Sequence, residues 1–243
     1  MTLSACGKTS VSTGPMRTET RSVGEFHSIE VEGATRLEIT VGAPASLEIE
    51  GRELWVKRVE TDVREGVLYI KSQRKDWVTI GTSPRLKIRI GVPKLASLGL
   101  EGGNDVRLSG FNGGSTKFRV AGATDLRGSG RLDELNIFMA GAGHVDMSQL
   151  VAKAADVTVA GVGSVLVHPA ESLNATMNGV GTIFYSGSPR EVSTHMNGLG
   201  AIGRRGGSDA KAPDVESKPV DPESLNPEYE QDPQPEAKNT GVI

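Results

Sequence analysis

The sequence is poor in cysteine, in aromatic residues and in long apolar runs. Cys6 is the one cysteine among 243 residues, which excludes a disulfide within the chain and a zinc site built from several cysteines. Aromatic residues make up only 4% of the chain, so large rings cannot dominate its core. No run of eighteen apolar residues occurs, and no segment shows a helical stripe, so a membrane-spanning helix is not expected.

Charge is also low, and it is unevenly distributed. The net charge is -3, but the segment 206–243 contains nine acidic residues and three lysines, which leaves the rest of the chain slightly positive. No basic cluster is interleaved with aromatic residues, so we expect no nucleic-acid partner. The sequence suggests no cofactor.

The segment 206–243 differs from the rest of the chain in composition. Six of the twelve prolines lie there, among acidic and small polar residues, with Tyr229 as its one aromatic residue. Such a segment cannot bury enough apolar surface to order itself. We therefore predict a disordered acidic tail.

The start of the chain resembles the cleavage site of bacterial lipoproteins. The letters LSAC at residues 3–6 match a lipobox, in which the cysteine is lipidated, although no basic segment or apolar run precedes them. Either the sequence begins inside an export signal or the match is a coincidence. We predict the former, with Cys6 as the lipidation site and residues 1–20 as lipobox remnant and flexible tether. Gly7 is compatible with sorting to the outer membrane of a Gram-negative cell.

What the sequence does contain is glycine, 31 residues in all, placed at a regular interval. A short motif centred on glycine recurs every 18 to 20 residues, and such a period is typical of a solenoid. Side chains at every second position around these glycines are apolar, and this alternation is characteristic of strands. The central glycines of this motif are Gly102, Gly122, Gly141, Gly161, Gly179 and Gly198.

This repeat predicts an all-β, single-domain parallel β-helix with coils of 19–20 residues, right-handed by the usual preference. Equivalent residues of successive coils then stack at the strand spacing of about 4.8 Å. One inward column contains Leu98, Phe118 and Ile137, and we expect the glycines to mark the corner of each coil, where two backbones approach closely. Asn178 and Asn197 are expected to form a short amide ladder.

The solenoid domain is expected to span residues 21–205, with regular coils over 96–205 and a less regular half over 21–95. Alternation around Gly33 in the segment 26–42 indicates that the solenoid begins there. Five further strands are expected in the segments 47–51, 54–63, 67–73, 78–81 and 86–95. Trp55 and Trp77 are expected to pack across this half.

The chain resembles a known family at three places. These are the pattern F-x-x-I-x-V at 26–31, the step IGVPKL at 90–95 and the serial G-x-G coils. Together they are similar to the bacterial DUF2807 domains, also called the putative auto-transporter adhesin head GIN domain, over about residues 21–205. The resemblance implies a β-solenoid on an exported and often lipid-anchored protein, with no catalytic residues to carry over.

The third residue after each corner glycine forms an outward column that contains Asp105, Asp125 and His144. Arg107 and Arg127 stand two residues further on, on the same face. Two carboxylates about 4.8 Å apart in water repel by about 0.9 kcal/mol, which the arginines easily offset. The column is therefore a solvated charge ladder or, alternatively, a site for acid–base chemistry. A flat column does not converge on a metal ion, so no metal site is expected. His27, His168 and His195 are expected to lie at the surface.

These observations favour a non-enzymatic lipoprotein of the cell envelope, at the outer membrane or in the periplasm. Its rigid surface would bind or adhere to envelope glycans or proteins, with the membrane reached through the lipid on Cys6. Two alternatives remain open: a carbohydrate-active enzyme using Asp105, Asp125 and His144, or a structural component that forms a homo-oligomer by stacking through its ends or faces.

Overall fold

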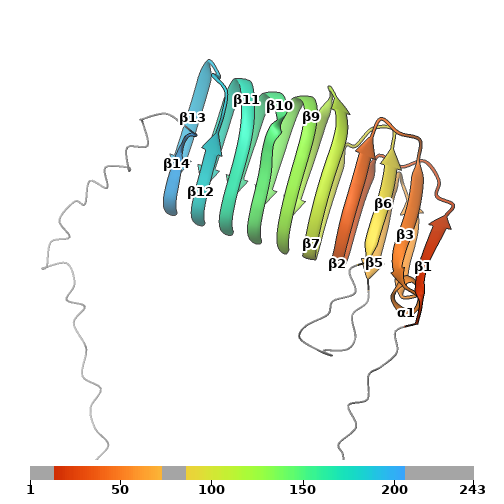
Figure 1. Ribbon diagram of the computed structural model, residues 1–243. Coiled ribbons are helices and arrows are strands. Elements are labelled where there is room, and N and C mark those ends of the chain that lie inside the picture. Colours follow the sequence, from red (N-terminus) through yellow and green to blue (C-terminus); the bar gives the residue numbers. More distant parts are fainter. Residues whose placement is uncertain (1–13, 73–85, 206–243) are drawn as a thin grey trace, which may run out of the picture. The chain divides into compact units, whose positions relative to one another are not determined.

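The protein is a parallel β-solenoid of about five turns, as the glycine repeat predicts (Figure 1). The computed structural model describes residues 14–72 and 86–205. The predictions for Cys6, for Trp77, for the strand at 78–81 and for the tail 206–243 lie outside these residues. No helix in the described ranges is long and apolar enough to cross a membrane.

The regular coils are built from strands that pair in parallel with the equivalent strand of the next coil. The register is that of the repeat: Leu98 pairs with Phe118, Phe118 with Ile137, and so on through the stack. The strands are β7 (Ser97–Asn112), β8 (Ser115–Val120), β9 (Ala123–Met139), β10 (Ala142–Val159), β11 (Val162–Met177), β12 (Val180–Tyr185), β13 (Glu191–Met196) and β14 (Leu199–Arg204).

Each coil presents two outer faces. Face A is the outer surface of the segments that follow the corner glycines, such as 142–147 in β10. Face B is the outer surface of the segments that precede the next corner, such as 154–159. Inward side chains of both segments meet in one continuous core, where Phe118, Val157 and Ile183 are almost completely buried.

The corner glycines lie directly over one another. A Cβ atom on Gly161 would lie 1.8 Å from the carbonyl oxygen of Gly141, and one on Gly141 would lie 2.0 Å from that of Gly122. No side chain larger than hydrogen fits there without moving the neighbouring backbone. Beside this stack, Asn197 donates a hydrogen bond from Nδ2 to Oδ1 of Asn178 at 3.0 Å, which confirms the predicted amide ladder.

In the N-terminal half, the order of the coils in space departs from the order in sequence. The strands are β1 (Met16–Arg21), β2 (Ser28–Val41), β3 (Ser46–Arg52), β4 (Val59–Arg64), β5 (Val67–Ser72) and β6 (Lys87–Val92), with a helical turn α1 (Glu53–Val56). Strand β2 pairs with β7 on one side and with β5 and β6 on the other, all in parallel. Strand β2 is the first parallel strand along the chain, as the sequence predicted, but it is not the outermost parallel strand in space, because the later segments β5 and β6 stack outside it.

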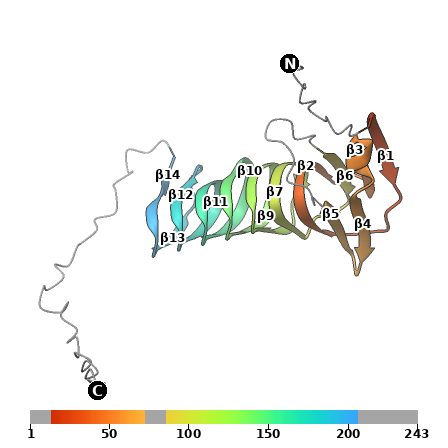
Figure 2. The ribbon, with the colours of Figure 1, turned by 90° about the horizontal axis from the view of Figure 1, so that it is seen from below.

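Antiparallel strands then cap this end of the stack (Figure 2). Strand β3 pairs antiparallel with β6, β1 with β3, and β4 with β5. The chain crosses from β3 to β4 through α1, so the prediction of one strand over 54–63 is wrong in its first residues. Val56 is completely buried and Trp55 packs against the core there, and this packing outweighs the strand pattern.

Candidate functional site

Face A carries a continuous row of polar side chains across the first coils. The register places Asp105 opposite Arg36 on one neighbouring strand and opposite Asp125 on the other. Asp125 is in turn opposite His144, so the column predicted from the repeat is one row in space. A second row, two residues along, contains Glu38, Arg107, Arg127 and Asp146.

Arginines neutralise the two aspartates of the first row. Arg36 Nε lies 2.9 Å from Asp105 Oδ2, and Arg107 Nη1 lies 3.6 Å from Asp105 Oδ1. Arg127 Nη2 lies 2.7 Å from Asp125 Oδ2. Each carboxylate thus has one oxygen in a close ion pair.

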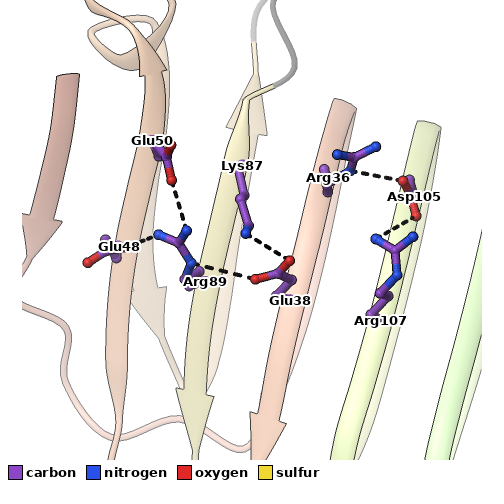
Figure 3. A network of polar contacts seen from close by, with 8 residues as sticks. All are labelled: Arg36, Glu38, Glu48, Glu50, Lys87, Arg89, Asp105 and Arg107. Atoms are coloured by element: carbon purple, nitrogen blue, oxygen red, sulfur yellow. Dashed lines mark hydrogen bonds and ion pairs between the residues drawn. The ribbon is translucent and has the colours of Figure 1, made fainter. Parts of the chain in front are cut away.

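The polar row continues onto the cap as a denser network (Figure 3). Arg89 of β6 contacts Glu48 and Glu50 of β3, the latter at 2.9 Å, and its Nε lies 3.5 Å from Glu38 of β2. Lys87 Nζ lies 2.9 Å from the other oxygen of Glu38. These contacts join the antiparallel cap to the first parallel coils across three strands, β3, β6 and β2.

Asp146 extends the second row toward the later coils. Burial alone would raise the pKa of its carboxyl, but hydrogen bonds from the side chain and the backbone N–H of Ser148 outweigh that effect and hold the pKa below its ordinary value. The backbone N–H of Ser148 lies 3.0 Å from Asp146 Oδ1. Asp146 is therefore ionised and held in place by its own turn.

A groove runs along the corner edge of face A, from α1 across β2, β7, β9 and β10. Its volume is about 660 Å³. Asp105, Asp125 and His144 line it, together with Trp55 at its α1 end and Thr124 beside Asp125. Arg107 and Arg127 do not line it. They line a separate hollow of about 490 Å³ with Asp146, so the predicted five-residue column is divided between two surfaces.

The groove gathers buried polar atoms that make no hydrogen bond. Within the described ranges, four buried side-chain atoms lack a hydrogen bond, and all four belong to residues that line this groove. They are Trp55 Nε1, Asp105 Oδ1, Thr124 Oγ1 and Asp125 Oδ1. Buried polar groups normally have partners, and leaving one without costs about 1–3 kcal/mol. Such a concentration in one place singles out this groove among the hollows of the described residues.

Thr124 belongs to a short column of buried polar residues beside the corner. Thr35 donates to Asn104 Oδ1 at 2.8 Å, and Asn104 Nδ2 donates to the Glu101 carbonyl at 3.2 Å. Thr124, the next member, is 4% exposed and makes no hydrogen bond through its hydroxyl. The following coils have glycine at this position, beginning with Gly143. The polar column is thus confined to the coils that form the groove.

His144 and Trp55 close the two ends of the groove. His144 Nδ1 lies 2.5 Å from Ser164 Oγ, which fixes the orientation of the ring. At the other end, the guanidinium carbon of Arg58 lies 5.5 Å from the centre of the Trp55 ring, a cation–π contact. In the part of the chain that the structure describes, no three His, Cys, Asp or Glu side chains are grouped to hold a metal ion.

Sequence reasoning identified Asp105, Asp125 and His144, and expected Trp55 to pack, which it does, but it missed Thr124 and Asn104. The signal was available in the alternation of inward and outward residues along each strand. Thr35, Asn104 and Thr124 are polar at inward positions, where an apolar residue is expected. Of the other histidines, His27 and His195 are exposed, whereas His168 is half-buried, with Nδ1 3.3 Å from the Ser148 carbonyl oxygen.

Comparison with known proteins connects this fold to proteins named as adhesins. A crystal structure of a putative adhesin from Bacteroides fragilis superposes with a TM-score of 0.60 at 23% identity, covering 79% of this chain and 97% of that one. A putative adhesin from Parabacteroides distasonis gives a TM-score of 0.45 at 18% identity, covering 79% and 98%. No curated protein matches the chain. A family model matches residues 25–189, and by that match the chain belongs to DUF2807, described as "putative auto-transporter adhesin, head GIN domain".

Proposed function

We propose that this chain is a non-enzymatic binding protein of the cell envelope, anchored through a lipid on Cys6, whose groove on face A holds a neutral glycan. The family's description as an adhesin head is consistent with binding. The observation that carries the proposal is that all four buried side-chain polar atoms without a hydrogen bond in the described ranges belong to residues that line one groove.

The chemistry of the groove favours a neutral ligand with many hydroxyl groups. Arg36, Arg107 and Arg127 neutralise the two aspartates, so a free cation gains little there. The second oxygen of each carboxylate remains an acceptor without a hydrogen bond. A sugar hydroxyl donates well to such an oxygen, because hydrogen bonds to charged groups are worth about 1.5–3 kcal/mol.

The remaining groups complete the set that a glycan needs. Trp55 offers an indole N–H donor and an aromatic surface, and Thr124 offers a hydroxyl that both donates and accepts. The groove extends along the stack over four successive coils, which suits an extended chain of sugar units better than a compact molecule.

An enzymatic role for the same residues is less well supported. Asp105 and Asp125 are both held in arginine ion pairs, and His144 is engaged with Ser164. A general acid must present a proton and a general base a free lone pair at the reacting atoms. The arrangement is better suited to recognition than to proton transfer.

The test is binding of the purified chain to an array of envelope glycans, followed by titration of the best ligand. The variant Asp105→Asn keeps the shape of the side chain and removes its charge, and we expect it to raise the Kd about tenfold, or about 1.4 kcal/mol. Asp156→Asn is the matched control, since Asp156 lies on face B and hydrogen-bonds Asn174 at 2.7 Å. Absence of glycan binding, or equal losses in both variants, would contradict the proposal.

A further inference from the structure

The two ends of the solenoid differ in the side chains that their outermost strands carry. At the N-terminal end the outermost strands are β1 and β4, and each carries a charged side chain at every second position, for example Arg17, Glu19 and Arg21 in β1. Charges along an edge strand prevent it from pairing with another chain. At the other end β13 pairs only with β11 and β14 only with β12 among the described strands. Each of these has one charged residue, Glu191 and Arg204.

Exposed apolar side chains also concentrate at the C-terminal end. Seven large hydrophobic residues of the described ranges are exposed, and four of them lie in the last coils. Val162, Val180 and Leu199, at 58%, 47% and 72%, form one outward column on face A, and Val192, at 43%, lies in the end coil. Val192 occupies an inward column, opposite Leu173, which is 2% exposed. It is exposed because no described residue lies over it. The core side chains of the end coil are therefore not covered by a further coil among the described residues.

From these features we infer that the open end pairs with the same end of a second copy of this chain. A twofold axis normal to both faces makes β13 pair with β13 and β14 with β14, both antiparallel. Inward side chains then meet inward side chains, so that Val192, Met196 and Ile202 of one copy close the core of the other. The fold already accepts antiparallel strands on a parallel coil, as β3 does on β6 and β4 on β5.

A second copy fits this end better than other occupants. It covers both open edges at once, whereas a single added strand covers only one. Stacking of the open end onto the capped end of another copy would place the charges of β1 and β4 against apolar residues, at a desolvation cost. The sequence that follows Arg205 contains six prolines, and proline cannot donate a hydrogen bond to a strand ladder. This inference does not depend on the groove.

The experiment is sedimentation velocity of the full chain over a concentration series, with two threonine variants. Thr194→Lys places a charge in the inward column of the end coil, where Thr194 is exposed and pairs with Ala175. Thr20→Lys is the matched control, on exposed strand β1 at the capped end. We expect the parent and Thr20→Lys to reach twice the 25.6 kDa chain mass, and Thr194→Lys to weaken the dimer at least about tenfold. Circular dichroism and thermal melting verify that both variants fold.

Hydrogen exchange provides a second readout that does not depend on the variants. Backbone amides of 191–204 should gain protection as the concentration rises, while those of β1 and β4 should not change. A parent chain that stays monomeric at every concentration, protection that does not depend on concentration, or a dimer that Thr194→Lys leaves intact would each overturn the inference. Failure of glycan binding would leave it untouched, so the two proposals fail separately.

Discussion

The stack of corner glycines predicts that adding a single methyl group will strongly lower the stability of the fold. In Gly161→Ala the new Cβ would lie 1.8 Å from the Gly141 carbonyl oxygen. Ordinary van der Waals contact begins at about 3.4 Å, so the two coils must separate locally by more than an ångström. The carbonyl of Gly141 also accepts the hydrogen bond from Val162 N–H at 2.9 Å, which such a shift would break.

The magnitude follows from these two effects. Overpacking costs about 1–3 kcal/mol, and an unpaired buried backbone group about 1–3 kcal/mol more. We therefore expect Gly161→Ala to lower the free energy of unfolding by about 3–5 kcal/mol, a large part of the roughly 5–15 kcal/mol that holds a domain together. Urea unfolding, followed by circular dichroism, measures the change.

Gly103→Ala is the matched control, because Gly103 directly follows the corner glycine Gly102. There the nearest atom to a new Cβ is the Cβ of Ala34 at 3.8 Å, an ordinary contact. The same column contains alanine in later coils, at Ala123 and Ala142. We expect a change within about 0.5 kcal/mol. If Gly161→Ala were equally mild, close approach of the coils would not be the reason for the glycines.

Two further predictions concern Thr124 and Asp133. Thr124→Val keeps the side-chain volume and removes a buried hydroxyl without a partner, so urea unfolding should show a gain of about 1 kcal/mol while glycan binding weakens; a loss of stability would mean that the hydroxyl is paired. The Lys153 ammonium, at 2.7 Å, and the Gly114 N–H hold the pKa of Asp133 below the ordinary 3.8. The ion pair's contribution to stability is complete above pH 3.8 and is lost as the pH falls through the lowered pKa. Asp133→Asn should therefore be less stable than the parent at pH 7, and the difference should disappear once the pH is below that lowered pKa. A difference that does not change with pH would refute this.

The regular half of the fold could be predicted from the sequence because its strand pairing is determined by residues that are close in the chain. Each coil repeats the residue classes of its neighbour, so counting from one glycine to the next gives the strand register, and Asp105, Asp125 and His144 align as counted. The N-terminal half lacks this signal. Nothing in the segments 67–72 and 87–92 shows that they stack on β2 rather than after it, since that arrangement depends on contacts between distant segments.

The groove was predictable only in part, for a related reason. The carboxylate row belongs to the repeat, but Trp55 reaches the groove from α1, which lies outside the repeat and whose position depends on the packing of the cap. Which oxygen of each carboxylate is paired depends on the arginines of neighbouring strands. Sequence periodicity gives neighbours along the stack but not side-chain orientation.

The placement of β2 between segments that follow it in the chain has a consequence for the folding pathway. Neighbouring regular coils join residues about 20 apart, whereas Thr35 of β2 contacts Asn104 across 69 residues. By loop-closure entropy alone, the longer connection costs about 1 kcal/mol more, before any contact compensates for it. We therefore expect the later coils to form first and the N-terminal strands to pair with them afterwards. The protein then folds from its C-terminal half toward its N-terminus.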